Sequence, residues 1–400
     1  MITIAMFSHD SVGLGHARRN RALAHALAAE LPGLTGQPVR GVLIAGHPEV
    51  ARDSLPSGWD WMVLPGVAPD HGGYVPRHLG GSLSELASLR AAVLDATLAE
   101  LAPDLFVVDR HPYGIDGELR SVLSRIRRRG GRTVLGLREV LDDPAVTTAE
   151  WDRIGGAEQV AAAYDAVWVY GDPTIYDPRL SGEVPAALAR RATATGYLSQ
   201  GRPDPLDEFS HALDGTEPMP QVLTVLGGGS DGSALARIAA AAAPPPGHEH
   251  LVVTGPQMPP NAVAEVRAVA APGVEVVQRV DDLPRRIASA AAVVSMGGYN
   301  TVTEVLATDT PALVVPRVER RDEQRRRAIS LAAAGMVETM PLARLTTAAV
   351  EDFFARQVGH RILRAGIDLA GLSRVPQLAA TLLDRPSTHI RLQQEEPHAV

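Results

Sequence analysis

Short hydrophobic runs alternate with longer amphipathic segments along most of the 400-residue chain. In the first half, the hydrophobic runs predict buried strands at residues 2–7, 41–45, 105–108, 133–137 and 166–170. Helices are predicted between them, at residues 16–31, 83–101 and 117–129. Strands that alternate with helices in this way predict an α/β fold with parallel sheets.

A second series of the same kind follows a break in the pattern. Residues 198–220 hold four prolines and no sustained apolar period, which is typical of a linker. Further strands are predicted at residues 221–226, 251–254, 274–278, 291–295 and 312–315. We therefore predict two similar α/β domains, at residues 1–197 and 221–375. Residues 376–400 form a tail that is placed to pack back on the first domain.

Composition excludes several kinds of chemistry. The chain has no cysteine and no lysine, so all 38 basic residues are arginine. Disulfides, thiol nucleophiles, cysteine-bound metals, lysine-bound pyridoxal cofactors and a Walker-type phosphate lysine are therefore ruled out. A net charge of −8 argues against a nucleic-acid partner.

Hydropathy bears on location. No apolar run reaches 18 residues, and the first ten residues lack the layout of a secretory signal. We expect a soluble cytoplasmic protein, with no sequence feature that indicates a peripheral membrane contact. The sequence leaves the oligomeric state open.

Three glycine turns, at residues 13–15, 227–232 and 297–298, each follow a predicted strand and open a predicted helix. A helix amino terminus offers free backbone N–H groups and a partial positive charge, and glycine lets a phosphate come close to that backbone. One such turn says little, because a tight turn needs glycine in any case. Three turns at the carboxyl ends of strands favour a phosphate-bearing ligand.

The second turn also fits the pattern G-x-G-x-x-G. A nicotinamide dinucleotide would require an acidic residue about 20 positions later, at the end of the next strand. That strand ends in Gly255 and Pro256, and the nearest acidic residue, Glu249, precedes it. A mononucleotide diphosphate fits better, with the hydroxyls of Ser230 and Ser233 as additional donors.

Residues 291–328 contain in order a glycine turn, a helix with Glu304, an apolar strand and a loop ending in Glu323 and Gln324. This order resembles the donor half of nucleotide-sugar glycosyltransferases with two Rossmann-like domains, the GT-B fold. It is most similar to the peptidoglycan lipid-intermediate N-acetylglucosaminyltransferase group, which belongs to family 28. The resemblance covers most of the second predicted domain and the first 30 residues.

The resemblance implies a site for a nucleotide diphosphate sugar, expected to be a UDP-sugar. Glu304 would bind the ribose hydroxyls, Glu323 and Gln324 would bind sugar hydroxyls, and the backbone at Val280 would read the base. The glycine turns would meet the diphosphate and complete the donor site, with Gly228, Gly229, Ser230, Gly298, Asn300 and Thr301. The arginine-rich residues 317–327 form either an exposed helix start or a place where an arginine holds phosphate or an acidic substrate.

The first domain would then supply the acceptor side and the base. His16 opens the first helix, and histidine is well suited to take a hydroxyl proton near neutral pH. The matching GLGH element of the family points into the cleft, but His16 could instead cap the helix or bind the acceptor. The other candidate base, Asp109, ends a strand and could also orient a histidine. His9, also at a strand end, is a weaker third candidate for the base. The acceptor-side candidates are Gly13, Gly15 and His111.

One departure from the peptidoglycan group concerns phosphate. That group has a phosphate-holding arginine before the linker, where this chain carries Gln200. No acidic D-x-D pair follows a predicted strand, so we expect no metal and no cofactor beyond the nucleotide-sugar co-substrate.

These observations predict an inverting, metal-independent glycosyltransferase that moves a sugar to a hydroxyl or amine of a small-molecule or saccharide acceptor. Two alternatives stay open. The first is a nucleotide-sugar hydrolase or epimerase of the same fold, because GLGHARR also resembles the start of bacterial nucleotide-sugar hydrolases. The second is a nucleotide-sugar-binding sensor without catalytic activity.

Overall fold

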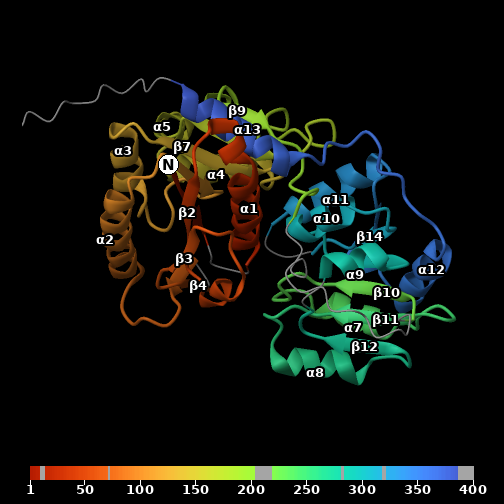
Figure 1. Ribbon diagram of the computed structural model, residues 1–400. Helices are drawn as coiled ribbons and strands as arrows, with labels where there is room; N and C mark the ends of the chain where they lie inside the picture. Colours follow the sequence, from red (N-terminus) through yellow and green to blue (C-terminus); the bar gives the residue numbers. More distant parts are fainter. Residues whose placement is uncertain (10–13, 71–72, 203–218, 281–282, 318–320, 386–400) are drawn as a thin grey trace, which may run out of the picture.

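The computed structural model describes residues 1–9, 14–70, 73–202, 219–280, 283–317 and 321–385. The predicted linker and tail, and Gly13 of the acceptor-side candidates, therefore fall partly or wholly outside the described residues. The chain forms two lobes, each built around one parallel sheet (Figure 1). This arrangement confirms the predicted α/β fold.

The first lobe contains a seven-stranded sheet in the order β3-β2-β1-β6-β7-β8-β9. Its strands are β1 (Ile2–Ser8), β2 (Val39–Ala45), β3 (Trp59–Val63), β6 (Leu105–Asp109), β7 (Arg132–Arg138), β8 (Ala166–Tyr170) and β9 (Ala192–Ala194). Its helices are α1 (Gly15–Thr35), α2 (Leu83–Leu101), α3 (Arg120–Arg128), α4 (Pro144–Arg153), α5 (Ala157–Ala163) and α6 (Ala186–Ala189). A short antiparallel hairpin pairs β4 (Val67–Asp70) with β5 (Gly73–Pro76).

The second lobe contains a six-stranded sheet in the order β12-β11-β10-β13-β14-β15. Its strands are β10 (Gln221–Val225), β11 (Glu249–Val253), β12 (Val274–Val277), β13 (Ala292–Ser295), β14 (Ala312–Val314) and β15 (Glu338–Thr339). Its helices are α7 (Ser233–Ala240), α8 (Pro260–Ala268), α9 (Leu283–Ser289), α10 (Tyr299–Leu306), α11 (Glu323–Ala333) and α12 (Thr347–Gln357).

The central strands are apolar on both faces because helices cover both sides of a parallel sheet. All seven residues of β1 are buried, and so are all five of β6. The two strands are neighbours although they are far apart in the chain, so the strand order reverses between them. The same reversal occurs between β10 and β13 in the second sheet. Ligands of open α/β sheets bind in the crevice outside the strand ends at such reversal points.

The last helix, α13 (Gly371–Asp384), returns to the first lobe and packs against α1 (Figure 1). Its first residue, Gly371, lies against the turn that follows β9. An added Cβ there would come within 2.6 Å of the carbonyl oxygen of Gly196, so this close approach requires glycine. The chain thus crosses between the lobes twice.

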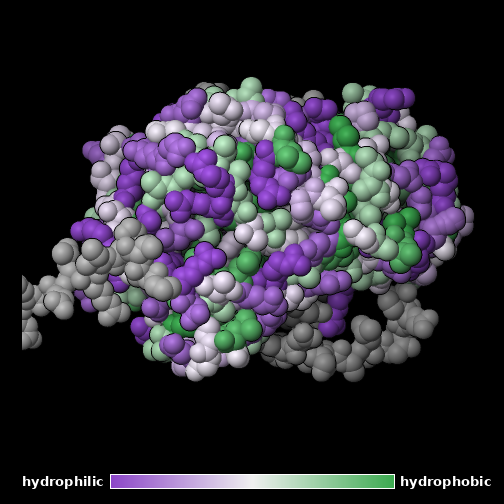
Figure 2. All heavy atoms as spheres, turned by 90° about the horizontal axis from the view of Figure 1, so that it is seen from above, coloured by the Kyte–Doolittle hydropathy of each residue, from purple (hydrophilic) through white to green (hydrophobic). Residues whose placement is uncertain are grey.

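The surface is mixed in polarity on the face drawn in Figure 2, where hydrophobic side chains form small separate groups among hydrophilic ones. Within the described part of the chain, no helix is long and apolar enough to span a membrane.

Candidate active site

Both lobes line a pocket of about 690 Å³ at the two points of strand-order reversal. The first lobe contributes the start of α1 and the residues after β6 and β7, and the second contributes the turns after β10 and β13. Ten arginines but only five carboxylates line this pocket, in a protein whose net charge is −8. The pocket is therefore positive and suits an anionic ligand.

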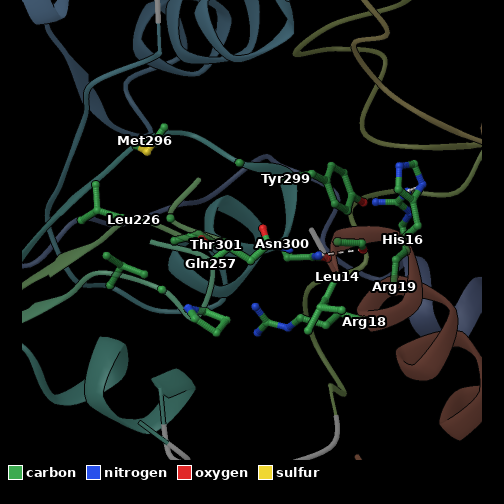
Figure 3. Close-up of a pocket in the computed structure, with 18 of the residues that line it drawn as sticks. Leu14, His16, Arg18, Arg19, Leu226, Gln257, Met296, Tyr299, Asn300 and Thr301 are labelled. Atoms are coloured by element: carbon green, nitrogen blue, oxygen red, sulfur yellow. Dashed lines mark hydrogen bonds between the residues drawn. The ribbon is translucent and has the colours of Figure 1, made fainter. Parts of the chain in front are cut away.

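The two sequence-predicted candidates for the base form one hydrogen-bonded pair. His16 lies in the first turn of α1, and its Nδ1 is 3.0 Å from Oδ2 of Asp109, the last residue of β6. Arg19, one turn further along α1, donates to the same carboxylate oxygen at 2.5 Å. Asp109 is fully buried, whereas 20% of the His16 side chain is exposed toward the pocket. Figure 3 shows His16 and Arg19 together, and the side chain of Asn300 from the second lobe, which donates to the backbone oxygen of Gly15 beside them at 2.9 Å.

The pair is held in a defined charge state. Burial raises the pKa of Asp109, but Arg19 and His16 outweigh burial and bring this pKa down to about 2. Burial lowers the pKa of His16 more than Asp109 raises it. At neutral pH the pair therefore consists of a carboxylate and a neutral imidazole, which can accept a proton.

Two further histidines lie beside His16. The rings of His9 and His111 are 3.8 Å apart between centroids, and both rings lie within about 6.5 Å of the His16 ring. Burial, and then the neighbouring histidine, lower the pKa of His9 to about 3 and that of His111 well below its usual value. His111 lines the pocket, while His9 is covered behind it. All three rings are neutral near pH 7.

We expect the free energy of unfolding to fall as the pH drops from 6.5 toward 3. Burial lowers the pKa of His9 to about 3 and that of His250 to about 4 in the folded protein, whereas an unfolded histidine takes up its proton near pH 6.5. The unfolded chain then binds more protons than the folded chain, so stability is full above pH 6.5 and is lost on acidification. Urea denaturation at pH 7 and pH 5 measures the loss. His250 contacts Thr224, away from the pocket, and His250→Gln should reduce the pH dependence; an unchanged dependence would contradict this account.

Glu304 in α10 is buried between arginines from both sides of the pocket. Its Oε1 accepts from Arg18 of α1 at 2.8 Å and from Arg202 at 3.4 Å. Its Oε2 is buried and has no hydrogen-bond partner among the residues that the structure describes. One carboxylate thus faces two guanidinium groups, which leaves a positive charge available for an anion and one oxygen available for a hydroxyl donor.

Arg202 was missed by the sequence analysis, which found only Gln200 where the peptidoglycan group has its phosphate arginine. Gln200 is exposed and does not line the pocket. Arg202 does line it, and it also donates to Oδ1 of Asn300 at 3.1 Å. The sequence did contain a signal for this residue: an arginine two positions after Gln200, within the segment that was predicted to be the linker.

The turn after β10 brings Gly227, Gly228, Gly229 and Ser230 to the pocket. Gly229 has a φ of 88°, and an added Cβ would come within 2.1 Å of a backbone oxygen. The turn therefore needs glycine for its own packing as well as for access to a ligand. Ser233, the other expected hydroxyl donor, begins α7 and does not line the pocket.

Glu323 and Gln324, at the start of α11, lie on the pocket wall and are buried. Arg317 connects them, because its side chain donates to Glu323 at 2.5 Å and its backbone N–H donates to Gln324 at 3.1 Å. Burial raises the pKa of Glu323, but Arg138, Arg317 and Arg327 outweigh it and lower the pKa overall. The second oxygen of Glu323, Oε2, is buried without a partner. Like Glu304, this carboxylate has one oxygen left for a ligand hydroxyl.

The matches to known proteins fall mainly on the second lobe. Residues 222–356 match the family model described as "Glycosyltransferase family 28 C-terminal domain". A curated relative from Methylibium petroleiphilum, "UDP-N-acetylglucosamine--N-acetylmuramyl-(pentapeptide) pyrophosphoryl-undecaprenol N-acetylglucosamine transferase", is 30% identical over 218 residues. The match covers 52% of this chain and 57% of the relative, so the chain spans just over half of that protein's length.

Solved structures show the fold of the whole chain. The glycosyltransferase SnogD from Streptomyces nogalater matches with a TM-score of 0.56 at 16% identity, over 96% of this chain and 95% of that chain. This chain has the GT-B fold, and its second lobe matches the model of the family 28 C-terminal domain. A putative UDP-N-acetylglucosamine 2-epimerase from Listeria monocytogenes also matches, with a TM-score of 0.56 at 11% identity over 94% of each chain.

In this GT-B protein, most of the sequence-predicted site residues lie around the one pocket. Those that line it are Gly15, His16, His111, Gly228, Gly229, Ser230, Val280, Gly298, Asn300, Thr301, Glu304, Glu323 and Gln324. Asp109 lies behind His16 and reaches the pocket only through it. Gly13 is outside the described residues. Across the part of the chain that the structure describes, no group of three or more side chains is arranged to hold a metal ion.

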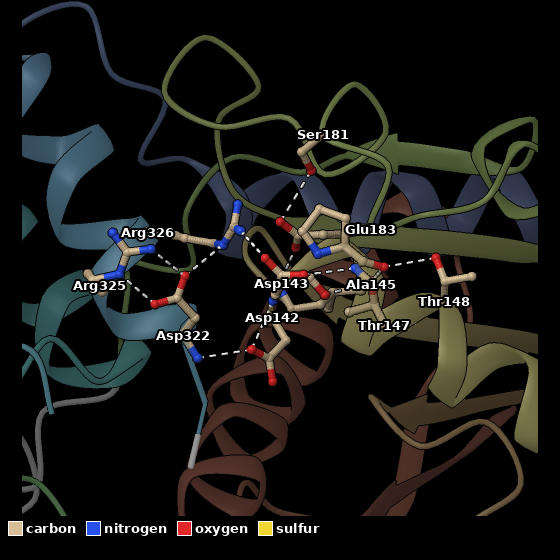
Figure 4. Close-up of polar contacts among 12 residues, drawn as sticks. Asp142, Asp143, Ala145, Thr147, Thr148, Ser181, Glu183, Asp322, Arg325 and Arg326 are labelled. Atoms are coloured by element: carbon tan, nitrogen blue, oxygen red, sulfur yellow. Dashed lines mark hydrogen bonds and ion pairs between the residues drawn. The ribbon is translucent and has the colours of Figure 1, made fainter. Parts of the chain in front are cut away.

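The arginine-rich segment before α11 joins the donor domain to the first lobe. Arg327 is fully buried and pairs with Glu139 of the first lobe at 2.5 Å. Arg326 pairs with Asp143 at 2.5 Å, and the backbone N–H of Asp322 donates to Asp142 at 2.9 Å (Figure 4). Arg326 and Arg327 therefore bind carboxylates of the other lobe. Arg325 is exposed at the start of α11, as one of the sequence interpretations expects.

Proposed function

We propose that the protein is an inverting glycosyltransferase that uses a nucleotide diphosphate sugar, expected to be a UDP-sugar, and no metal. The proposal rests on one observation: a neutral histidine from one lobe and a carboxylate from the other, with one oxygen available to a ligand, line the same pocket. His16, backed by Asp109, comes from the first lobe. Glu304, with one oxygen unpartnered, comes from the family 28 donor domain. The curated relative's name, which includes UDP-N-acetylglucosamine, supports a UDP-sugar.

The donor roles follow from the chemistry of each group. Oε2 of Glu304 would accept a hydrogen bond from a ribose hydroxyl, and Oε2 of Glu323 would accept one from the sugar. The diphosphate would lie at the turn of Gly228, Gly229 and Ser230. Arg18 and Arg202 share one carboxylate between them, so they have charge left to stabilise the diphosphate.

In the transfer step, an acceptor hydroxyl or amine attacks the anomeric carbon from the side opposite the diphosphate. Nδ1 of His16 is bonded to Asp109, which leaves Nε2 to take the acceptor's proton. The new bond to the acceptor forms as the bond from carbon to the diphosphate oxygen breaks, and configuration is inverted. The electron pair leaves with the diphosphate, whose charge the two arginines and the amino terminus of α10 would stabilise. Asp109 would keep His16 oriented and would stabilise the imidazolium as it forms.

Hydrolysis and epimerisation are the alternatives, because the same pocket could present water to the anomeric carbon and because the Listeria relative of similar fold is a putative epimerase. Product analysis separates them. UDP-N-acetylglucosamine incubated with the protein alone would yield free sugar and UDP from a hydrolase, or the 2-epimer from an epimerase. We expect neither product without an acceptor, and UDP release only when an acceptor is added. Rapid acceptor-independent formation of either product would contradict the transferase proposal.

A further inference from the structure

Arg138 is a charged side chain at the centre of the pocket that the donor roles do not use. It is the last residue of β7, next in the sheet to β6 and Asp109. It lines the pocket together with His16 and Glu323. Within the described residues it makes no hydrogen bond or ion pair, and its Nε is buried without a partner.

The other arginines of this part of the pocket are all paired. Arg19 binds Asp109, and Arg317 binds Glu323. Arg110 and Arg321 bind opposite oxygens of Glu150. Among the described residues, no carboxylate contacts the guanidinium of Arg138, which differs in this respect from these neighbouring arginines.

This position is electrostatically unfavourable without a ligand. Burial, together with the charges of Arg19, Arg327 and Arg110, lowers the pKa of Arg138 to about 9, although Glu323 raises it. Buried charges in proteins are normally paired or hydrogen-bonded, because an unpaired one loses its hydration without compensation. Charged groups kept in such a state cluster at binding sites.

We propose that Arg138 binds an anionic group, a carboxylate or a phosphate, carried by the acceptor. The proposal rests on the proposed function and extends it by naming the acceptor's chemical class. The donor diphosphate already has Arg18 and Arg202, both bound to Glu304, and the glycine turn after β10. Arg138 instead ends β7, the strand next to β6, whose last residue Asp109 binds His16. The acceptor must lie near His16 to give up its proton.

The neighbouring uncharged groups fit this assignment. His111 and Tyr74 also line the pocket on the first-lobe side, and both can form hydrogen bonds without adding charge. An acidic acceptor would bind Arg138 through its anionic group and present its hydroxyl or amine to His16. A neutral acceptor would leave the guanidinium of Arg138 unpaired in the closed complex, at a cost in affinity.

Titration calorimetry tests the proposal with simple anions as probes. The protein is first saturated with UDP, which fills the donor subsite, and is then titrated with pyrophosphate and, separately, with malonate. We expect at least one of these anions to bind, and Arg138→Gln to weaken that binding by about 10- to 100-fold, the usual value of a charge-assisted hydrogen bond. Arg138→Lys, which keeps the charge, should retain part of the affinity. Stronger binding of malonate would identify a carboxylate, and stronger binding of pyrophosphate a phosphate.

Arg128→Gln is the control, because Arg128 is an exposed arginine of the same lobe, in α3, and does not line the pocket. It should change anion affinity less than twofold. The proposal is overturned if neither anion binds, if Arg138→Gln binds them as well as the native protein, or if Arg138→Gln instead weakens UDP, which would assign the arginine to the donor. If UDP itself does not bind, the proposed function fails. In that case the same anion titrations without UDP still test whether Arg138 forms an anion site.

Discussion

Replacing His16 by alanine is expected to lower the turnover number by about 10²- to 10⁴-fold, the range that a positioned general base contributes. Nucleotide affinity should stay within twofold, because His16 contacts Asp109 and Arg19 and no donor-side residue. Steady-state rates and UDP titration on the same preparation measure the two effects. His25→Ala, on the same helix but away from the pocket, is the control and should leave both unchanged. Retained turnover in His16→Ala would remove His16 as the base.

The role of His16 as the base also predicts that kcat/KM decreases at acidic pH. Proton transfer needs neutral His16, whose pKa is lowered below 6.5 by burial, so kcat/KM should be flat at neutral pH and fall only well below pH 6.5. Asp109→Asn removes the group that raises the pKa of His16, so the decrease of kcat/KM should occur at lower pH than in the native protein. The maximal rate should also fall. A change in rate without a shift of this decrease would show that Asp109 acts only structurally.

Arg327→Met should lower the free energy of unfolding by about 3–5 kcal/mol, the usual effect of removing one partner from a buried ion pair. Arg327 is 1% exposed, and its partner Glu139 is fully buried, so the substitution leaves a carboxylate without solvent or counter-ion. Arg327 also donates to the carbonyl oxygen of Gly297 at 3.0 Å, in the glycine turn after β13. Donor affinity should therefore fall together with stability.

Urea denaturation and UDP titration measure the two effects of Arg327→Met. Arg325→Met is the control, because Arg325 is 57% exposed and pairs only with Asp322 within its own segment. That surface pair should contribute about 0–1 kcal/mol. If both variants lose the same free energy of unfolding, the buried ion pair between the lobes contributes no more to stability than the exposed one.

The sequence predicted the strands that carry the site, because buried parallel strands are continuous apolar runs. Residues 166–170 are predicted and observed with the same bounds, and the helix at 83–101 likewise. Strand β3 and the β4–β5 hairpin were not predicted. Asp60 interrupts the short apolar sequence Trp59–Val63 at the sheet edge, and the strands of the hairpin are short and only partly buried, so neither contains a long buried apolar run.

The candidate site was predictable as a set of residues but not as a set of contacts. His16 and Asp109 are 93 positions apart in the chain, and only the strand order makes β1 and β6 neighbours. The end of the arginine-rich segment, Arg326 and Arg327, was misinterpreted for a similar reason. Its carboxylate partners, such as Glu139, lie 188 positions away in the other lobe, and local charge pattern carries no information about them.

The most direct test of the central claim is the melting temperature of the protein with UDP, GDP, dTDP or NAD at saturating concentration. A ligand at a hundred times its Kd stabilises the folded state by about 2.7 kcal/mol. We predict that one nucleoside diphosphate, expected to be UDP, raises the melting temperature of the native protein, and that Glu304→Gln reduces the shift. A shift with NAD alone, or with none of the four ligands, would contradict a nucleotide-sugar donor site in this pocket.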